Sequence, residues 1–404
     1  MDRWIGRLIA VGGTVLIAAC GGDGGPPPVP DRPQAESRDF LYLSNLAAPQ
    51  VDGRRLTTIE DQTAAVFDRL ERMLLERGLD LDDVVAANVF LRDARDFAAM
   101  NAVYRERLGA APPTRATVQA GLSDPDALVQ LSVVAARHGN REVIEPAGLA
   151  SPSLPYRWGI RVGNTVFVAG ATSRDPETFE PQPGTVGTQV RRVFGNIGLV
   201  LAEAGLDYGD LVACKAFLAD PRRFGEMNHA YREFFPNDDP PVRATVGARL
   251  VNPRFEVEIQ CIADRDASRR VVLAEGATRP ASPFSPGIQV GNRLYLAGMV
   301  GRGPDGFAPD AEGQTRQALA NLRATLLAAG MDFPDVVDLW VFIADLRDAE
   351  AVHGVLAGLP NGLGSTGTVV GTPLMSPAAR VEIMMTAERA ESGDGGSGGV
   401  GGGA

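Results

Sequence analysis

The stretch "GAAPPTRATVQAGL" (residues 109–122) recurs as "NDDPPVRATVGARL" (residues 237–250), and the two copies share a proline, an arginine and the run Ala-Thr-Val. A third stretch, "NGLGSTGTVVGTPL" (residues 361–374), has a similar outline but carries Thr366 where the alignment expects the arginine. A string of this length repeated at wide spacing indicates that one structural unit is duplicated along the chain.

The repeat extends well upstream of these strings. The segments that echo one another are residues 62–104, 189–231 and, more faintly, 314–356. Gly78, Gly205 and Gly330 end the first helical pattern of each copy, and near-constant offsets between such landmarks predict three copies of one domain.

The hydrophobic pattern within a copy predicts both helices and strands. Val66, Leu70, Met73 and Leu74 follow a helical spacing, and the glycine after them suits a left-handed helix end. Runs such as "VVAANVFL" and "FEVEIQCIA" predict strands. The first copy begins abruptly at "FLYLSN", so we expect its sheet to be short of strands.

These landmarks divide the chain of 404 residues into six segments. The predicted segments are a signal peptide (1–19), a Gly/Pro-rich tether (20–37), repeat 1 (38–138), repeat 2 (139–266), repeat 3 (267–390) and a disordered Gly-rich tail (391–404).

The N-terminal segment has the order of features found in a bacterial lipoprotein signal. Arg3 and Arg7 precede an apolar run, which closes on Ile-Ala-Ala and Cys20. We expect Cys20 to be lipidated, so that the protein is a membrane-anchored lipoprotein of the cell envelope, on the periplasmic face of the outer membrane. A cleaved signal with an incidental cysteine is the alternative.

Composition excludes several classes of function. The net charge of -11 is spread along the chain, which argues against a nucleic-acid partner. The three histidines, His138, His229 and His353, lack metal-ligand spacing, so neither a metal site nor a histidine-based triad is expected.

Two cysteines remain beyond Cys20. The repeats align Cys214 with Ala87 and Leu339, and align Cys261 with Val133 and Met385. Positions that accept these apolar residues belong to a core, so both cysteines are interpreted as buried thiols, with a disulfide as the less favoured alternative.

The order of these segments, with "F..MN..Y" followed by "P.RATV" and a last strand of the type "VEIE.IA", resembles the RidA family, also called YjgF/YER057c/UK114. The resemblance covers nearly everything from Phe40 to Ala387, three times over. It implies an α+β fold, a chorismate-mutase-like (RidA/YjgF) domain. Family members form trimers with ligand clefts between subunits. Three tandem copies are therefore expected to form an intramolecular pseudo-trimer from a monomeric chain.

The resemblance also implies a chemistry. Family members hydrolyse imines and enamines of amino acids to 2-oxo acids and ammonia, without a cofactor. Arg115 and Arg243 would clamp the carboxylate of a small imino acid, because a planar guanidinium matches a carboxylate with two parallel hydrogen bonds. Asn101 and Asn228 would orient the cleft, or bond to backbone instead. The third copy, with Thr366, is expected to have lost the arginine site or to have converted it to a different ligand.

The residues expected to place the attacking water are less well matched. In the family, the last strand reads Glu-hydrophobic-Glu, and its second Glu is the residue held to polarise the water. In this chain that position is occupied by Ser132, Gln260 and Met384 in the three repeats. Gln260 and Ser132 are therefore weak catalytic candidates, because neither is a strong base. Ser44 keeps the serine of the family's Ser-Gly turn, and Tyr156 matches its cleft tyrosine.

Two functions stay open at this point. The first is a RidA-like imine/enamine deaminase whose substrates are clamped by arginine. The second is a non-catalytic module of the same fold that binds a small carboxylate or acts as a scaffold. Whether the chain is an enzyme is left undecided by the sequence.

Overall fold

The computed structural model describes residues 35–50, 54–138, 141–236, 239–360 and 367–389. All of them belong to one compact unit. The predicted signal peptide, Cys20, Thr366 and the Gly-rich tail lie outside the described residues. Within the described residues, no helix has the length and apolar character needed to cross a membrane.

Each repeat contributes one long and one short helix. The long helices are α1 (Ile59–Leu75), α3 (Val186–Glu203) and α5 (Ala311–Ala328), and the short ones are α2 (Phe97–Leu108), α4 (Phe224–Arg232) and α6 (Ala349–Leu356). The side chain of Thr58, Thr185 or Asp310 caps the start of each long helix by accepting a backbone N–H. The predicted glycines after these helices have φ angles of 66° to 70°, which is the left-handed conformation that favours glycine.

Three mixed sheets accompany the helices. The strand order in sheet 1 is β1 (Ala35–Glu36), β2 (Phe40–Ala47), β6 (Val129–Ala136), β3 (Val84–Leu91), β4 (Thr114–Gln119) and β12 (Arg249–Leu250). The order in sheet 2 is β11 (Val242–Gly247), β10 (Leu211–Leu218), β13 (Val257–Asp264), β9 (Thr165–Thr172), β8 (Gly159–Val162) and β7 (Glu142–Ile144). The order in sheet 3 is β14 (Arg270–Val272), β15 (Gly287–Val290), β16 (Arg293–Val300), β21 (Val381–Glu388), β19 (Val336–Ile343), β20 (Thr368–Gly371) and β5 (Gly121–Leu122). A separate hairpin joins β17 (Arg302–Gly303) to β18 (Gly306–Phe307).

The first repeat is short of strands, as predicted. Beyond β2 it has only the two-residue strand β1, whereas the second repeat adds β8 and β7 beyond β9, and the third adds β15 and β14 beyond β16. The cause lies in the sequence, because the first copy starts at the strand that the other two copies precede with a hairpin.

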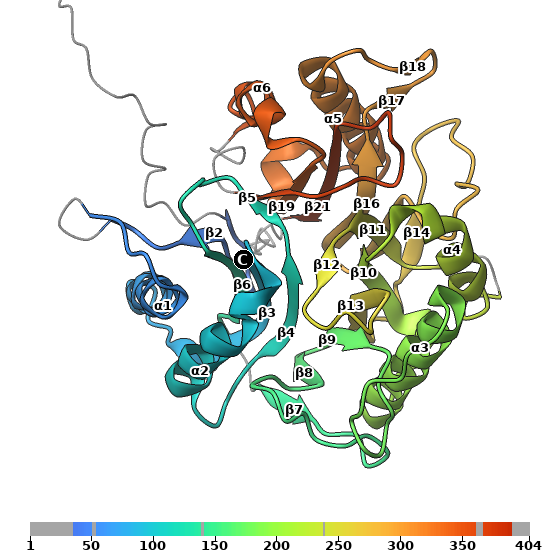
Figure 1. The fold of residues 1–404 in the computed structure, drawn as a ribbon. Helices are drawn as coiled ribbons and strands as arrows, with labels where there is room; N and C mark the ends of the chain where they lie inside the picture. The colour runs from blue at the N-terminus through green and yellow to red at the C-terminus, as the bar shows by residue number, and fades with distance from the viewer. Residues whose placement is uncertain (1–34, 51–53, 139–140, 237–238, 361–366, 390–404) are drawn as a thin grey trace, which may run out of the picture. The chain divides into compact units, whose positions relative to one another are not determined.

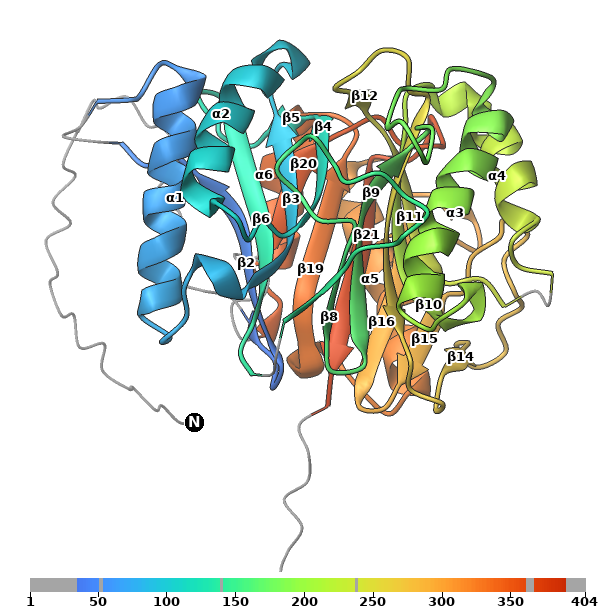
Figure 2. The same cartoon turned by 90° about the horizontal axis from the view of Figure 1, so that it is seen from below.

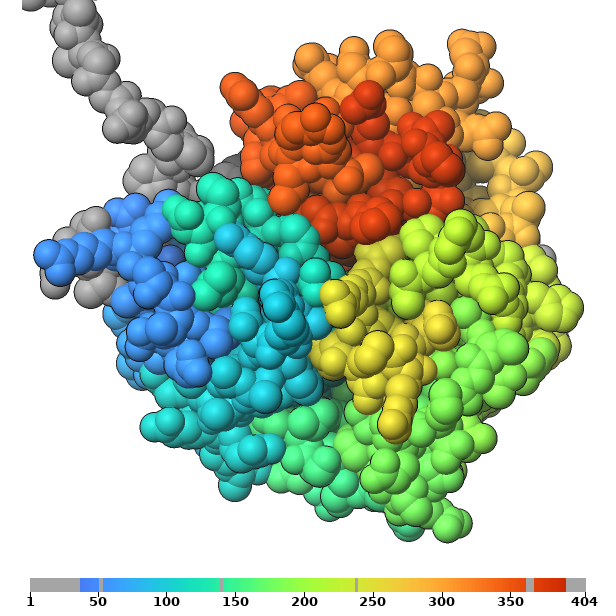
Figure 3. Space-filling view, in the orientation of Figure 1, coloured from blue at the N-terminus to red at the C-terminus, as the bar shows by residue number. Residues whose placement is uncertain are grey.

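The helices lie on the outer side of the sheets, and the sheets turn their other faces toward one another (Figures 1 and 2). Each repeat therefore has its own core between helices and sheet, and a further core joins residues of all three repeats. Because both faces of the sheet are buried, the sequence of a strand such as β3 is almost entirely apolar instead of alternating between apolar and polar residues. Three colour sectors, one for each repeat, meet in Figure 3.

Short edge contacts join the three repeats in a ring. β12 of repeat 2 pairs with β4 of repeat 1, and β5 of repeat 1 pairs with β20 of repeat 3. A bridge between Val246 and Leu374 joins repeat 2 to repeat 3. The three tandem α+β domains are thus arranged as the expected intramolecular pseudo-trimer.

The pairing register corrects the alignment of the third copy. Arg115 lies opposite Ala87 and Arg243 opposite Cys214, whereas Trp340 lies opposite Thr368. The residue before Trp340, Leu339, aligns with Ala87 and Cys214, and the residue before Thr368 is Gly367. Gly367, and not Thr366, therefore occupies the arginine position. A Cβ atom at Gly367 would lie 2.8 Å from a methyl carbon of Leu339, so this position accepts no arginine without a rearrangement.

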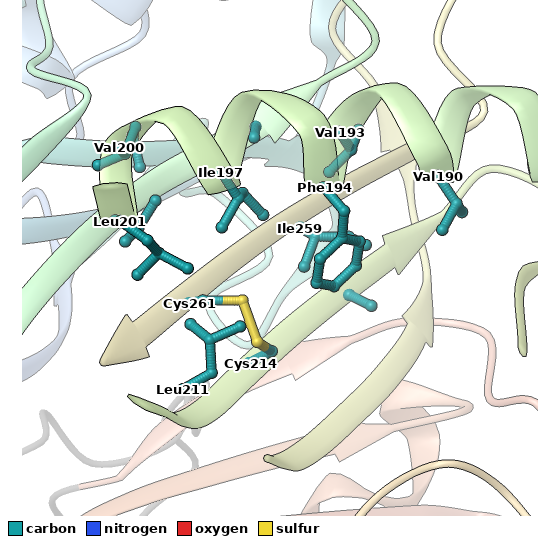
Figure 4. Close-up of a cluster of buried hydrophobic side chains, with 14 of the residues drawn as sticks. Val190, Val193, Phe194, Ile197, Val200, Leu201, Leu211, Cys214, Ile259 and Cys261 are labelled. Atoms are coloured by element: carbon teal, nitrogen blue, oxygen red, sulfur yellow. A yellow bond between two sulfur atoms is a disulfide. The ribbon is translucent and has the colours of Figure 1, made fainter. Parts of the chain in front are cut away.

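Cys214 and Cys261 form a disulfide, which corrects the prediction of two free thiols. The two residues lie directly opposite each other on β10 and β13, with Cα atoms 4.1 Å apart. Figure 4 shows the bond beneath α3, among apolar side chains. The alignment identified two core positions correctly but could not show that they face each other, as Ala87 and Val133 also do in repeat 1.

We expect the disulfide to stabilise the fold by roughly 2–4 kcal/mol, because it closes a loop between residues 47 positions apart. The double substitution Cys214→Ala/Cys261→Val, which installs the pair found in repeat 1, should lower the free energy of unfolding by that amount in urea titrations. Wild-type protein reduced with dithiothreitol provides the matched control. Absence of a Cys214–Cys261 linked peptide from a non-reducing digest would contradict the assignment.

Candidate functional site

Arg115 is the centre of the first cleft. It lies on β4 and is only 4% exposed, although it carries a charge. Its guanidinium carbon lies 4.6 Å from the ring centroid of Tyr104, on α2, and 6.0 Å from that of Tyr156, which comes from repeat 2. Its Nη1 atom has no hydrogen-bond partner among the described residues. The structure therefore brings two predicted residues, Arg115 and Tyr156, together from different repeats.

Arg243 is the centre of an equivalent cleft between repeats 2 and 3. It is 3% exposed, its guanidinium carbon lies 4.4 Å from the ring centroid of Tyr231, and its Nη1 atom likewise lacks a partner among the described residues. Its Nη2 atom donates to Oδ1 of Asn228 at 2.6 Å, so this asparagine contacts the arginine directly. Asn101 has the matching position on α2, but its buried Oδ1 has no partner among the described residues.

Each arginine cleft also contains a buried carboxyl group that the sequence analysis did not select. Oε1 of Glu258 accepts a hydrogen bond from the backbone N–H of Thr117, two residues after Arg115 and on the neighbouring repeat. Oε1 of Glu382 accepts the equivalent bond from Thr245, two residues after Arg243. Both carboxyls are buried. Burial raises the pKa of each to about 7, against the pull of the nearby arginine.

Glycine makes room for these carboxyls. A Cβ atom at Gly170 would lie 2.2 Å from Oε1 of Glu258 and 2.8 Å from Cβ of Ala116. Gly298 stands in the same relation to Glu382. The sheet of one repeat can therefore approach the arginine strand of the preceding repeat closely enough for the carboxyl to reach its backbone.

The third cleft lacks every one of these groups. Gly367 replaces the arginine, Gln130 replaces the glutamate, and Asn45 stands where the other repeats have Gly170 and Gly298. The Nε2 atom of Gln130 donates to the carbonyl of Val369 at 3.3 Å, so its amide bonds to the backbone of β20 instead. The third cleft therefore has Gly367 at the position that Arg115 and Arg243 occupy in the other two.

Gln260 and Ser132 do not lie with the arginines. Oε1 of Gln260 accepts a hydrogen bond from Asn88 at 2.8 Å, and Oγ of Ser132 shares one with Thr368 at 2.7 Å. Both residues line a separate cavity between the three sheets, together with Ser44. Glu258 and Gln260 share one face of β13, about 7 Å apart along the strand. The packing of repeat 2 against repeat 1 determines which of the two lies near an arginine. Glu258 is the one that lies near Arg115.

The two arginine clefts differ in one cation. Arg174 of repeat 2 interacts electrostatically with Tyr156 and Glu258, two residues that also face Arg115. It lies over Phe179 and Phe255, at 4.2 Å and 4.9 Å. Its counterpart in repeat 3, Arg302, is exposed.

Across the part of the chain that the structure describes, no group of three or more His, Cys, Asp or Glu residues could hold a metal ion.

Comparison with known proteins agrees with this architecture of three tandem domains and clefts between them. The family model described as endoribonuclease L-PSP matches the chain three times, over residues 34–137, 149–265 and 275–389. The chain therefore belongs to this family, the RidA/YjgF family.

Its relatives correspond to single repeats. A RutC family protein of Pyrococcus abyssi is 36% identical over 126 residues, which are 31% of this chain and 98% of the relative. The 2-iminobutanoate/2-iminopropanoate deaminase of Bos taurus is 29% identical over 123 residues, 30% of this chain and 89% of the relative. A solved chorismatase shares the fold over 76% of this chain and 93% of its own, with a TM-score of 0.52 and 14% identity.

The buried carboxyls make stability depend on pH. Because the pKa of Glu258 and Glu382 is raised from 4.5 to about 7, the folded protein binds these protons more tightly than the unfolded chain does. Stability should therefore fall as the pH rises from about 5 to about 7, by up to roughly 3 kcal/mol for each carboxyl.

Urea unfolding at about pH 5 and about pH 8 measures this effect. The variant Glu258→Gln/Glu382→Gln should lose the fall in stability, whereas Glu203→Gln, at an exposed position of α3, should retain it. An unchanged pH dependence in the double variant would contradict the assignment.

Proposed function

We propose that the chain is a RidA-like deaminase that hydrolyses small 2-imino and 2-enamino acids to 2-oxo acids and ammonia, in two clefts. One cleft contains Arg115 and Glu258, and the other contains Arg243 and Glu382. The observation that carries the proposal is the pair of buried guanidinium groups, each with an Nη1 atom that has no partner among the described residues.

A buried N–H without a partner costs about 1–3 kcal/mol, and more for a charged group. A carboxylate ligand would remove that cost, because its two oxygens match the guanidinium fork. The tyrosine rings beside each arginine exclude water and would strengthen this attraction. Small carboxylates are therefore the ligands that both clefts suit best.

The carboxyl groups supply the second requirement of the reaction. In the carboxylate form, Glu258 would accept a proton from a water molecule as the water oxygen bonds to the C=N carbon. It would return that proton to nitrogen, which gives a carbinolamine, and would then transfer the hydroxyl proton to nitrogen as the C–N bond breaks, which leaves a 2-oxo acid and ammonia. A pKa of about 7 suits a group that accepts and returns a proton near neutral pH.

The non-catalytic alternative rested on the absence of an acid from the water-placing position. Glu258 and Glu382 remove that support, because each arginine cleft has a buried carboxyl. Simple binding of a small carboxylate remains an outcome that the following experiment can reveal.

We expect the chain to accelerate hydrolysis of freshly generated 2-iminopropionate, measured as ammonia release in competition with semicarbazide. The variant Arg115→Ala/Arg243→Ala should lower kcat/KM by roughly 10–100-fold, the value of one hydrogen bond to a charged group. Glu258→Gln/Glu382→Gln should lower kcat while binding of pyruvate, a non-reacting carboxylate, persists.

The substitution Arg95→Ala is the matched control, because this arginine is exposed and pairs only with a neighbouring aspartate among the described residues. No acceleration by folded wild-type protein would reject the deaminase. If pyruvate binding persisted and disappeared only in the arginine variant, the non-catalytic alternative would replace it.

We also propose that lipidated Cys20 anchors the protein to a membrane of the cell envelope. The proposal rests on the charged, apolar and small-residue order that precedes this cysteine. In a bacterial host, wild-type protein should sediment with membranes, and Cys20→Ser should not. A mature N-terminus without lipid on Cys20, read by mass spectrometry, would reject the proposal.

A further inference from the structure

Lys215 is the only lysine in the chain, in which the remaining 38 of the 39 basic Lys and Arg residues are arginines. It lies on β10 and its side chain faces the cavity between the three sheets. Asn88 and Trp340 hold the equivalent positions of the other repeats, because each lies opposite the matching residue of its own last strand. Three different side chains therefore meet at one level of the pseudo-three-fold axis.

The cavity has a volume of about 60 Å³ and receives residues from all three repeats. This volume is room for roughly four water molecules, or for a ligand of a few non-hydrogen atoms. Lys215 and Asp338 keep part of their surface accessible, whereas Asn88, Gln260 and Trp340 around them are buried. The amine and the carboxyl are thus the groups that the cavity leaves open to a small molecule.

Neighbouring groups hold the lysine amine in place. Nζ donates to Oδ1 of Asn88 at 2.9 Å and lies 3.5 Å from the ring centroid of Trp340. Nδ2 of Asn88 donates in turn to Gln260 at 2.8 Å, which keeps the asparagine oxygen directed at the amine. These contacts limit the freedom of the side chain before any ligand arrives, which favours reaction at Nζ.

Burial of the amine favours its neutral form. Burial lowers the pKa of Lys215 to about 7, and Asp338 opposes this shift only in part. Asp338 accepts a hydrogen bond from Nε1 of Trp340 at 2.7 Å, and burial raises its pKa. The other titratable groups that line the cavity are Tyr42 and Tyr295, and burial raises the pKa of both.

Arginine could not serve the same purpose here. A guanidinium stays protonated in proteins, whereas a desolvated lysine amine can lose its proton and act as a nucleophile. A chain that uses arginine at every other basic side-chain position, and lysine only here, has placed its one lysine amine in a cavity.

We propose that Lys215 is the nucleophile of a separate axial site, which binds small uncharged aldehydes covalently as a Schiff base. The lone pair of Nζ attacks the carbonyl carbon, and one proton passes from the amine nitrogen to the carbonyl oxygen to give a carbinolamine. Loss of one water molecule then forms the C=N bond. Asp338 is the acid of the cavity that can donate and recover the proton.

The size and charge of the cavity select the ligand class. Its lining contains no arginine, so a carboxylate would find only Lys215, whose amine reacts in its neutral form, and would meet Asp338. A 2-oxo acid is therefore disfavoured, and an aldehyde of two or three carbons fits. The aromatic rings of Phe40 and Phe167 would contact its alkyl part.

Reductive trapping tests the proposal on the full-length chain. The folded protein is incubated with acetaldehyde and sodium cyanoborohydride near neutral pH, and ethylated peptides are quantified by mass spectrometry. We expect Lys215 to react roughly 100-fold faster than free Nα-acetyl-lysine, because the far larger neutral fraction of its amine outweighs the lower nucleophilicity of a less basic amine. Its rate should level off above pH about 7, whereas that of free lysine should continue to rise.

The controls separate this site from the arginine clefts. Arg115→Ala/Arg243→Ala should be ethylated at Lys215 like the wild type, so the axial site can stand or fall independently of the deaminase. Lys215→Arg, with its folding checked by circular dichroism, should be labelled only at its N-terminal amine, which is the internal reference in every sample. Labelling of Lys215 that is no faster than free lysine, or that needs denaturant, would overturn the proposal.

Discussion

The structure depends on one contact made twice, in which the arginine strand of a repeat packs across the sheet of the next repeat. The hydrogen bonds from Thr117 to Glu258 and from Thr245 to Glu382 mark this contact. Glycine at positions 170 and 298 permits it, because any side chain there would collide with the carboxyl or with the strand opposite. The same approach buries the strands on both faces and creates the clefts, so fold and candidate site have a common physical origin.

Joining three domains in one chain allows the clefts to diverge. A homotrimer must have three identical clefts, whereas here two keep an arginine and a glutamate, and the third has Gly367 and Gln130. The axial positions diverge even further, as Asn88, Lys215 and Trp340. Three lysines at this level would compete for one small cavity, whereas the single lysine has an asparagine and a tryptophan as its neighbours. The axial site is therefore available to a tandem chain and costly for a symmetric one.

Several features could be predicted from sequence because they depend on local spacing. The three repeats, the helix ends at Gly78, Gly205 and Gly330, and the shortened first sheet follow from periodicity and from glycine chemistry. Arg115 and Arg243 stood out because a repeated arginine in an apolar strand needs a partner. Other features depend on long-range geometry. Glu258 and Gln260 alternate in the same way along their strand, so the sequence pattern does not show which of them faces an arginine. Cys214 and Cys261 align with apolar residues of the other repeats, and this alignment does not show that they lie directly opposite each other on β10 and β13.

The sequence by itself determined the number of domains, their α+β class and the arginines on which the clefts centre, since periodicity and side-chain chemistry act over a few residues. Tertiary structure alone decided which glutamate faces each arginine, that the two cysteines are bonded, that Gly367 fills the third arginine position, and that the single lysine lies on the axis. Each of these depends on the register between strands or between repeats. A shift of one residue turns a side chain to the opposite face, and only the packed structure fixes that register.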